Sequence, residues 1–157
     1  MIIFRTAAGD QERGAQLRTN RHVERAPSVL VVDDTEEVAE LYAAVLATAG
    51  YHVTTASDGR SGLGLASVLR PDLIILDMMM PELCGLEFLM LLKELPAAPP
   101  VIANSGYAAF GALSLARGAT AFLMKPIAPQ DLIATVERAL DQRAPSVTNG
   151  GSRPPSP

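Results

Sequence analysis

Short apolar runs alternate with longer segments of mixed polarity through the middle of the chain. The apolar runs predict strands at residues 29–32, 52–56, 73–76, 101–103 and 121–124. The segments between them have helical length and predict helices at residues 36–49, 59–69, 82–95, 108–117 and 129–143. In the first of these segments, one apolar stripe is formed by Val38, Leu41, Val45 and Leu46, and Gly50 follows as a stop signal.

This alternation predicts the fold class. Strands that are apolar throughout need a layer of helices on each face of their sheet. Five strands alternating with five helices therefore predict an α/β fold of three layers, a doubly wound (βα)5 parallel sheet with right-handed crossovers. Asp34 and Thr35 are candidate N-caps for the first helix.

The two ends of the chain differ from the middle. The first residues read MIIF and then turn polar, and no sustained apolar period follows before the first predicted strand. We therefore expect a flexible N-terminal arm over residues 1–27. Residues 144–157 are rich in Pro, Ser and Gly and predict a disordered tail, which leaves residues 28–143 as the folded domain.

Charge and composition limit the partners and the compartment. The chain has a formal net charge of -4, and acidic side chains outnumber basic ones in the folded part, so we expect no nucleic-acid binding. Cys84 is the single cysteine, which favours a reducing compartment. No apolar run approaches the length of a membrane span or a signal peptide, so we expect a cytoplasmic protein with no membrane contact.

Side chains capable of chemistry follow four of the five predicted strands. Asp33 and Asp34 follow the first strand, Asp77 the third, Ser105 the fourth and Lys125 the fifth. In an open α/β sheet, ligands bind beyond the carboxyl ends of the strands. Each residue alone also has a plain structural interpretation, such as a helix cap, a turn former or a loop hydroxyl. Their joint placement is what predicts a site.

The residue types in this set indicate phosphate chemistry with a metal ion. Clustered carboxylates repel one another unless a cation is present, and their hard oxygen atoms suit Mg²⁺. Asp77, at the end of the middle strand, is then a candidate nucleophile toward phosphorus. Lys125 is one of only two lysines and brings a compact positive charge, and Ser105 can donate a hydrogen bond to a phosphoryl oxygen.

In this order and at these spacings, the motifs resemble the receiver domain of two-component response regulators, the chemotaxis-regulator-like fold. The resemblance covers about residues 28–143 and rests on VLVVDD, on LIILDMMMPELCGLEFL, on the S-G-Y after the fourth strand and on G-A-x-A-F-L-x-K-P. It implies a five-stranded sheet in the order 2-1-3-4-5. It also implies a single-domain regulator in a phosphorelay, a signalling protein that assists only its own phosphorylation and dephosphorylation and is not otherwise an enzyme.

The resemblance further implies roles for individual residues. Asp77 matches the phosphoacceptor, which would receive its phosphoryl group from a sensor histidine kinase or a histidine phosphotransfer protein. Asp33 and Asp34 match the acidic pair that holds Mg²⁺ together with Asp77 and the backbone carbonyl of Met79. Lys125 matches the lysine that neutralises charge on the transferring group.

Phosphorylation is expected to change the surface of the domain. By the resemblance, Ser105 moves inward and Phe122 packs into the space that it leaves, although a permanently buried ring is the alternative for Phe122. The Lys125–Pro126 peptide bond is expected to be cis. The fourth helix and the fifth strand would present the signal to a downstream protein, or to a second copy in a homodimer.

Other classes fit the sequence less well. Haloacid-dehalogenase-like phosphatases need a second Asp two residues after the nucleophile, where this chain has Met79. A flavin-binding module of similar topology would need a hydroxyl-rich or glycine-rich loop after the first strand, where this chain has DDTEE. A pseudo-receiver that binds a protein partner without phosphorylation stays as the alternative, although the acidic pair, Asp77 and Lys125 are all present.

Overall fold

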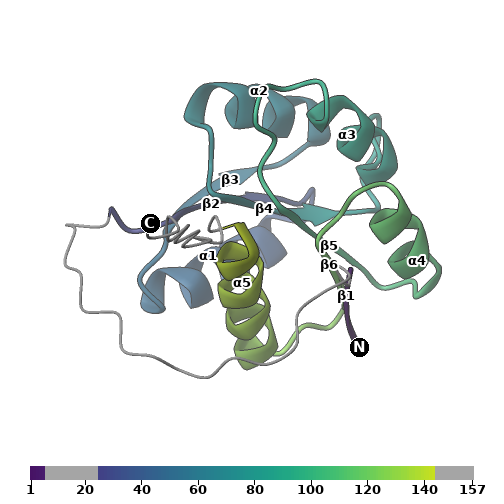
Figure 1. Cartoon of the computed structure of the whole chain (residues 1–157). Helices are drawn as coiled ribbons and strands as arrows, with labels where there is room; N and C mark the ends of the chain where they lie inside the picture. The colour runs from purple at the N-terminus through teal and green to yellow at the C-terminus, as the bar shows by residue number, and fades with distance from the viewer. Residues whose placement is uncertain (6–24, 144–157) are drawn as a thin grey trace, which may run out of the picture.

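The computed structural model describes residues 1–5 and 25–143, and Figure 1 shows their arrangement. The strands are β1 (Ile2–Phe4), β2 (Ser28–Val32), β3 (His52–Ala56), β4 (Leu73–Asp77), β5 (Val101–Ser105) and β6 (Ala121–Met124). The helices are α1 (Glu36–Thr48), α2 (Gly59–Leu69), α3 (Gly85–Leu92), α4 (Ala109–Ala116) and α5 (Pro129–Arg143). Helices α1 and α5 lie on one face of the sheet, and α2 and α3 lie on the other (Figure 1).

The sheet has six strands in the order β1-β6-β5-β4-β2-β3. Strands β2 to β6 pair in parallel with their neighbours, whereas β1 pairs with β6 in the antiparallel direction. The α/β class and the three layers agree with the prediction. The sheet is not the predicted five-stranded one, because β1 adds a sixth strand beside β6; the five predicted strands, β2 to β6, keep the order 2-1-3-4-5 among themselves.

The side chains of strand β1 pack against apolar residues on both faces of the sheet. Ile3 lies opposite Phe122 and packs against the apolar cluster under α4. Gly111 of α4 leaves room for it, since a Cβ atom there would lie 3.1 Å from Ile3 Cδ1. Phe4 packs against the other apolar cluster, where the Arg138 guanidinium carbon lies 4.4 Å from its ring centroid. A short segment is thus fixed by contacts with residues far along the chain.

The predicted N-terminal arm therefore needs a correction. Residues 1–27 were expected to be flexible throughout, but Ile2–Phe4 form a strand. Three apolar residues are too few to give a periodic signal, and their partner strand is remote in sequence. Residues 6–24 and the predicted tail at 144–157 lie outside the described part of the chain.

Helix α3 is shorter than the helix predicted at 82–95. Glu82 has a φ of 65°, which a right-handed helix does not allow, so the chain is still in a loop at this point. The helix begins at Gly85, and the Glu87 carboxylate accepts a hydrogen bond of 3.1 Å from the Cys84 N–H, as in a capping box. The extra loop residues, 82–84, lengthen the loop that follows Asp77.

Two apolar clusters fix the strands between the helix layers. One packs beneath α2, α3 and α4 and includes Leu30, Leu76 and Phe88. The other packs beneath α1 and α5 and includes Val31, Ile75 and Val136. The central strands β2, β4 and β5 are therefore buried on both faces, which gives the residues at their ends fixed positions.

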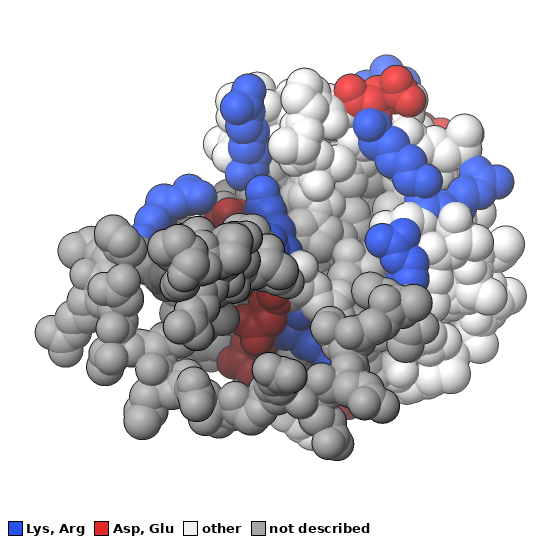
Figure 2. Space-filling view, in the orientation of Figure 1, with Lys and Arg blue, Asp and Glu red and all other residues white. Residues whose placement is uncertain are grey.

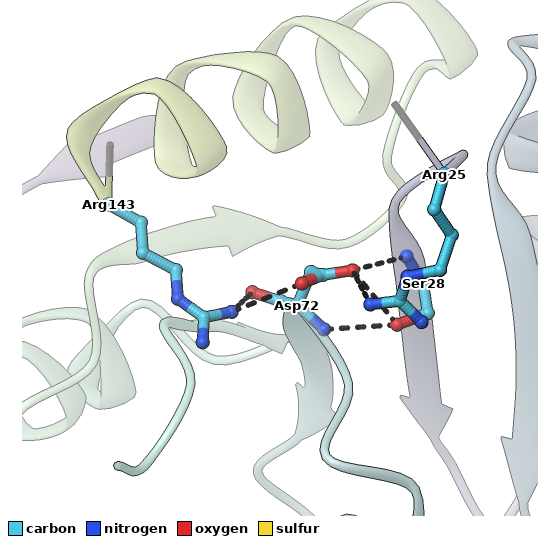
Figure 3. Close-up of polar contacts among 4 residues, drawn as sticks. All are labelled: Arg25, Ser28, Asp72 and Arg143. Atoms are coloured by element: carbon cyan, nitrogen blue, oxygen red, sulfur yellow. Dashed lines mark hydrogen bonds and ion pairs between the residues drawn. The ribbon is translucent and has the colours of Figure 1, made fainter. Parts of the chain in front are cut away.

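A polar junction lies at the amino end of the sheet (Figure 3). The Asp72 carboxylate accepts hydrogen bonds from the Ser28 N–H at 2.8 Å and from Arg25 at 3.2 Å. Arg143, the last residue of α5, donates to the Asp72 carbonyl oxygen at 3.0 Å. Burial alone would raise the pKa of Asp72, but the bonds from Ser28 and the charges of Arg25 and Arg143 together lower it.

Replacing Asp72 by Ala should lower the free energy of unfolding by about 2 kcal/mol at neutral pH, because charge-assisted hydrogen bonds are lost. The folded-state pKa of Asp72 is lowered, so its contribution is present above the unfolded pKa and disappears as the pH falls through the folded pKa. Urea unfolding at neutral and at acidic pH measures both effects. Glu40→Ala, at an exposed position of α1, is the matched control; equal losses in both variants would contradict the prediction.

Basic side chains are prominent on the face shown in Figure 2. The net charge of the chain therefore does not by itself exclude contact with a polyanion, and the absence of a nucleic-acid partner stays a prediction. Within residues 1–5 and 25–143, none of the helices has the length and apolar character that crossing a membrane requires.

Candidate functional site

Four neighbouring strands end at the same edge of the sheet. Strands β2, β4, β5 and β6 are adjacent and parallel, so their carboxyl ends lie together. Asp33 follows β2, Asp77 and Ser105 are the last residues of β4 and β5, and Lys125 follows β6. The predicted convergence of these side chains at one edge is what the structure shows.

Three carboxylates form the centre of this edge. One oxygen atom from each of Asp33, Asp34 and Asp77 lies within 4.8 Å of the other two. Asp33 and Asp77 are only 1% and 3% exposed, whereas Asp34 is exposed. Asp33 Oδ1 also accepts a hydrogen bond of 2.9 Å from the N–H of Thr35, the N-cap of α1. Because like charges at this distance repel, the cluster favours a bound cation.

Lys125 supplies one positive charge to the cluster. Its Nζ atom lies 3.0 Å from Asp33 Oδ2 and 3.5 Å from Asp77 Oδ1. The Lys125 N–H donates to the Ser105 carbonyl oxygen at 2.9 Å, which extends the pairing of β5 and β6 beyond the strands. The Lys125–Pro126 peptide bond is cis, as expected. One ammonium group leaves the three carboxylates with an excess of negative charge.

Asp77 is held in a tight loop and has a shifted pKa. The Met79 N–H donates to Asp77 Oδ1 at 3.2 Å. Gly85 lets α3 approach the chain here, since a Cβ atom on it would lie 2.7 Å from Met78 Cα and 3.0 Å from the Asp77 carbonyl oxygen. Burial raises the pKa of Asp77 to about 6, against the opposing effects of the Met79 N–H and the Lys125 charge. Its carboxylate is therefore mainly ionised near neutral pH.

These residues fit a divalent cation. Asp33, Asp34 and Asp77 offer hard oxygen ligands, and Mg²⁺ commonly binds a few carboxylates and keeps its remaining positions for water or phosphate oxygens. The side chain of Met79 is exposed and its N–H faces Asp77. The predicted role of the Met79 carbonyl as a further ligand stays a prediction.

The raised pKa of Asp77 predicts a pH-dependent stability of the metal-free protein. The Asp77 carboxyl group loses its proton near its ordinary pKa of 3.8 in the unfolded chain, whereas in the folded chain it keeps the proton until about pH 6. Between these two values the folded state binds more protons, so its stability falls as the pH rises. Relative to Asp77→Asn, the wild-type chain should lose about 3 kcal/mol across this range.

Urea unfolding at several pH values, with a chelator present, measures this difference. Asp58→Asn is a control of opposite sign, because the Ser61 N–H, 2.7 Å from Asp58 Oδ1, lowers the pKa of Asp58. Parallel stability curves for the wild-type chain and Asp77→Asn would contradict a raised pKa.

The two expected switch residues are both buried. The Ser105 hydroxyl accepts a hydrogen bond of 3.1 Å from the Tyr107 N–H, and the side chain of Tyr107 is exposed. The Phe122 ring is fully buried and belongs to the apolar cluster that Ile3 covers. This position matches the core alternative for Phe122. The expected movements of Ser105 and Phe122 stay predictions.

Two polar residues near the site were not singled out from the sequence. Asn104, directly before Ser105, is fully buried, and its amide atoms Nδ2 and Oδ1 have no hydrogen-bond partner among the described residues. Tyr42 of α1 is also buried; burial, followed by the charges of Asp33 and Asp77, raises its pKa. The signal for Asn104 was visible as one amide in a strand that is otherwise apolar up to its terminal serine.

Comparison with known proteins identifies the family. Residues 29–137 match the model of the response regulator receiver domain. The alkaline phosphatase synthesis transcriptional regulatory protein PhoP of Bacillus subtilis is 37% identical over 114 residues, which cover 71% of this chain and 48% of that protein. The DNA-binding response regulator MtrA of Mycobacterium tuberculosis is 34% identical over 113 residues, which cover 71% of this chain and 50% of that protein. The chain thus spans about half the length of these curated relatives.

Solved structures give the same result. The chemotaxis protein CheY4 of Vibrio cholerae is 32% identical, with a TM-score of 0.65 over 73% of this chain and 99% of that one. A putative response regulator from Chloroflexus aurantiacus is 29% identical, with a TM-score of 0.71 over 74% of this chain and 99% of that one.

Proposed function

The chain belongs to the response regulator receiver domain family of two-component signalling, and from this membership we propose that it accepts a phosphoryl group on Asp77. The donor would be a sensor histidine kinase or a histidine phosphotransfer protein. The phosphorylated chain would then signal to a protein partner by a change of conformation.

One observation supports this proposal most directly. Oxygen atoms of Asp33, Asp34 and Asp77 lie within 4.8 Å of one another, and the Lys125 ammonium lies 3.5 Å from Asp77. A nucleophile, an acidic pair and a compact cation therefore meet at one edge of the sheet. The pseudo-receiver alternative would not require this arrangement to be complete.

The acidic cluster would hold Mg²⁺ through Asp33, Asp34, Asp77 and the Met79 carbonyl. When bound, the ion would neutralise negative charge on the phosphoryl oxygens and hold that group in place. Asp33 and Asp77 are buried and fixed by strands with two covered faces, so these ligands need little reorganisation. Asp34 is exposed and lies at the open side of the site.

Asp77 would perform the transfer as an ionised carboxylate. One of its oxygens attacks phosphorus, the O–P bond forms as the P–N bond of phosphohistidine breaks, and the released imidazole takes a proton from solvent. Lys125, whose Nζ atom lies 3.5 Å from Asp77 Oδ1, would neutralise charge on the transferring group. The Ser105 hydroxyl would turn from the Tyr107 N–H and donate to a phosphoryl oxygen.

The surface that would carry the signal differs from the expected one. The fourth helix and the fifth strand of the prediction correspond to α4 and β6. The outer edge of β6 is paired with β1, so a partner or a second copy would meet α4, β1 and α5 instead. Exposed Leu113 on α4 adds apolar area to this surface.

The proposed function is tested by incubating the chain with Mg²⁺ and acetyl phosphate and measuring its intact mass. We expect an increase of one phosphate, labile at alkaline pH as an acyl phosphate is, and located by peptide mapping at Asp77. A chain that stays unmodified with this donor and with a set of histidine kinases would leave the pseudo-receiver as the better description.

A further inference from the structure

Asn104 is a buried amide without a partner. Its side chain is fully buried, and both Nδ2 and Oδ1 lack hydrogen-bond partners among the described residues. An unpaired buried amide destabilises a fold, whereas an apolar residue of the same size would not. The carboxamide is therefore unfavourable in the state that the structure shows, and a state that uses it would account for its presence.

The position of Asn104 connects it to the site. It is the register partner of Asp77 on the neighbouring parallel strand, so the two side chains leave the sheet on the same face. The Met78 N–H donates to the Asn104 carbonyl oxygen at 2.9 Å, which ties the two strand ends together. Lys125 follows β6 and reaches Asp33 beyond β2, and strands β5 and β4 lie between these two; Asn104 is the last residue but one of β5.

The groups beside Asn104 also have unused hydrogen-bonding capacity. The Lys125 ammonium has three N–H donors and two carboxylate neighbours, Asp33 and Asp77. Within the described residues, Asp77 Oδ1 receives the Met79 N–H and faces Lys125, whereas Oδ2 accepts no hydrogen bond. Asn104 offers the two complementary groups, an acceptor for Lys125 and a donor for Asp77.

We propose that Asn104 is a positioning residue for phosphoryl transfer. Its carboxamide oxygen accepts a hydrogen bond from Lys125, and its amide group donates to the Asp77 carboxyl group, when Lys125 leaves Asp33 for the transferring group. Asn104 touches neither the phosphodonor nor phosphorus; it acts by holding Lys125 and Asp77 in their reacting positions. This inference rests on the proposed phosphorylation of Asp77.

Asn104→Leu should affect stability and phosphorylation in opposite directions. Removing an unpaired amide from the core should raise the midpoint of thermal unfolding by about 3 °C. Losing the contacts to Lys125 and Asp77 should slow phosphorylation by acetyl phosphate at saturation about tenfold. The donor concentration that gives half the maximal rate should not change, because Asn104 makes no contact with the donor.

Ile102→Leu is the matched control, at a buried position on the same strand and the same face, two residues before Asn104. It should keep the wild-type rate. If Asn104→Leu does not fold, Asn104→Ala tests the same contacts, and its rate should also fall about tenfold.

A rate within twofold of the wild-type chain in the folded variant would overturn the inference. So would a slower rate together with a lower unfolding midpoint in Asn104→Leu, since that pattern indicates a disturbed core. Either result leaves the proposed function intact if the wild-type chain is phosphorylated and Asp77→Asn is not.

Discussion

Asp77→Asn is expected to take up no phosphate from acetyl phosphate under any condition that phosphorylates the wild-type chain. The carboxamide has the same shape as the carboxylate but carries no negatively charged oxygen atom. It therefore cannot attack phosphorus and form an acyl phosphate. Asp77 is buried at the end of a central strand, and the isosteric change leaves the packing around it in place. Intact mass measured after incubation with Mg²⁺ and acetyl phosphate gives the result directly.

Asp72→Asn is the control for this substitution. Asp72 directly precedes the same strand, at the end opposite Asp77, and is also hydrogen-bonded, but it is remote from the site. This variant should be phosphorylated to the wild-type extent once it is folded. Phosphate found on Asp77→Asn, for instance at Asp34, would show that the acceptor was assigned to the wrong carboxylate.

Lys125→Met should slow phosphorylation about 10²-fold to 10³-fold, the loss typical when one group that stabilises transition-state charge is removed. Methionine keeps most of the length of the lysine stem and removes only the ammonium group. The charge of Lys125 also lowers the pKa of Asp77, so its loss should raise that pKa further above its present value of about 6. At neutral pH a smaller fraction of Asp77 would then be ionised, which slows the reaction in the same direction.

The chain offers one matched control for this change, because its only other lysine is Lys93. Lys93 is the exposed C-cap residue of α3, away from the acidic cluster. Lys93→Met should phosphorylate at the wild-type rate in a time course of intact mass. Equal rates for Lys125→Met and the wild-type chain would show that the ammonium has no part in the transfer.

Much of the fold could be predicted because its signals are local. The apolar run before Asp77 and the stripe that includes Leu46 each indicate a buried element without reference to the rest of the chain. The convergence of Asp33, Asp77 and Lys125 followed from one rule about parallel strands. The expected cis bond before Pro126 came from the family resemblance alone.

The features that were missed depend on contacts between distant residues. Ile3 is part of a strand because β1 pairs with β6 and because Gly111 leaves space for its side chain. A strand of three residues is too short to show an apolar period in the sequence. The late start of α3 depends on the positive φ of Glu82, which the helical pattern around it does not reveal. The lack of hydrogen-bond partners for the Asn104 amide depends on how the core packs around it. Sequence alone does not show which buried amides form hydrogen bonds.

The junction at Asp72 has a consequence for how this domain could be joined to others. Arg25, three residues before β2, and Arg143, the last residue of α5, both bind Asp72, so the segment that leads into β2 and the end of α5 lie at nearly the same point. That point lies at the opposite end of β4 from Asp77, roughly 16 Å away at the rise of a parallel strand. A module attached after α5 would start from this far end of the sheet and leave the approach to Asp77 open for a phosphodonor, whereas Met1, whose carbonyl oxygen accepts from the Met124 N–H at 3.0 Å, lies at the opposite edge.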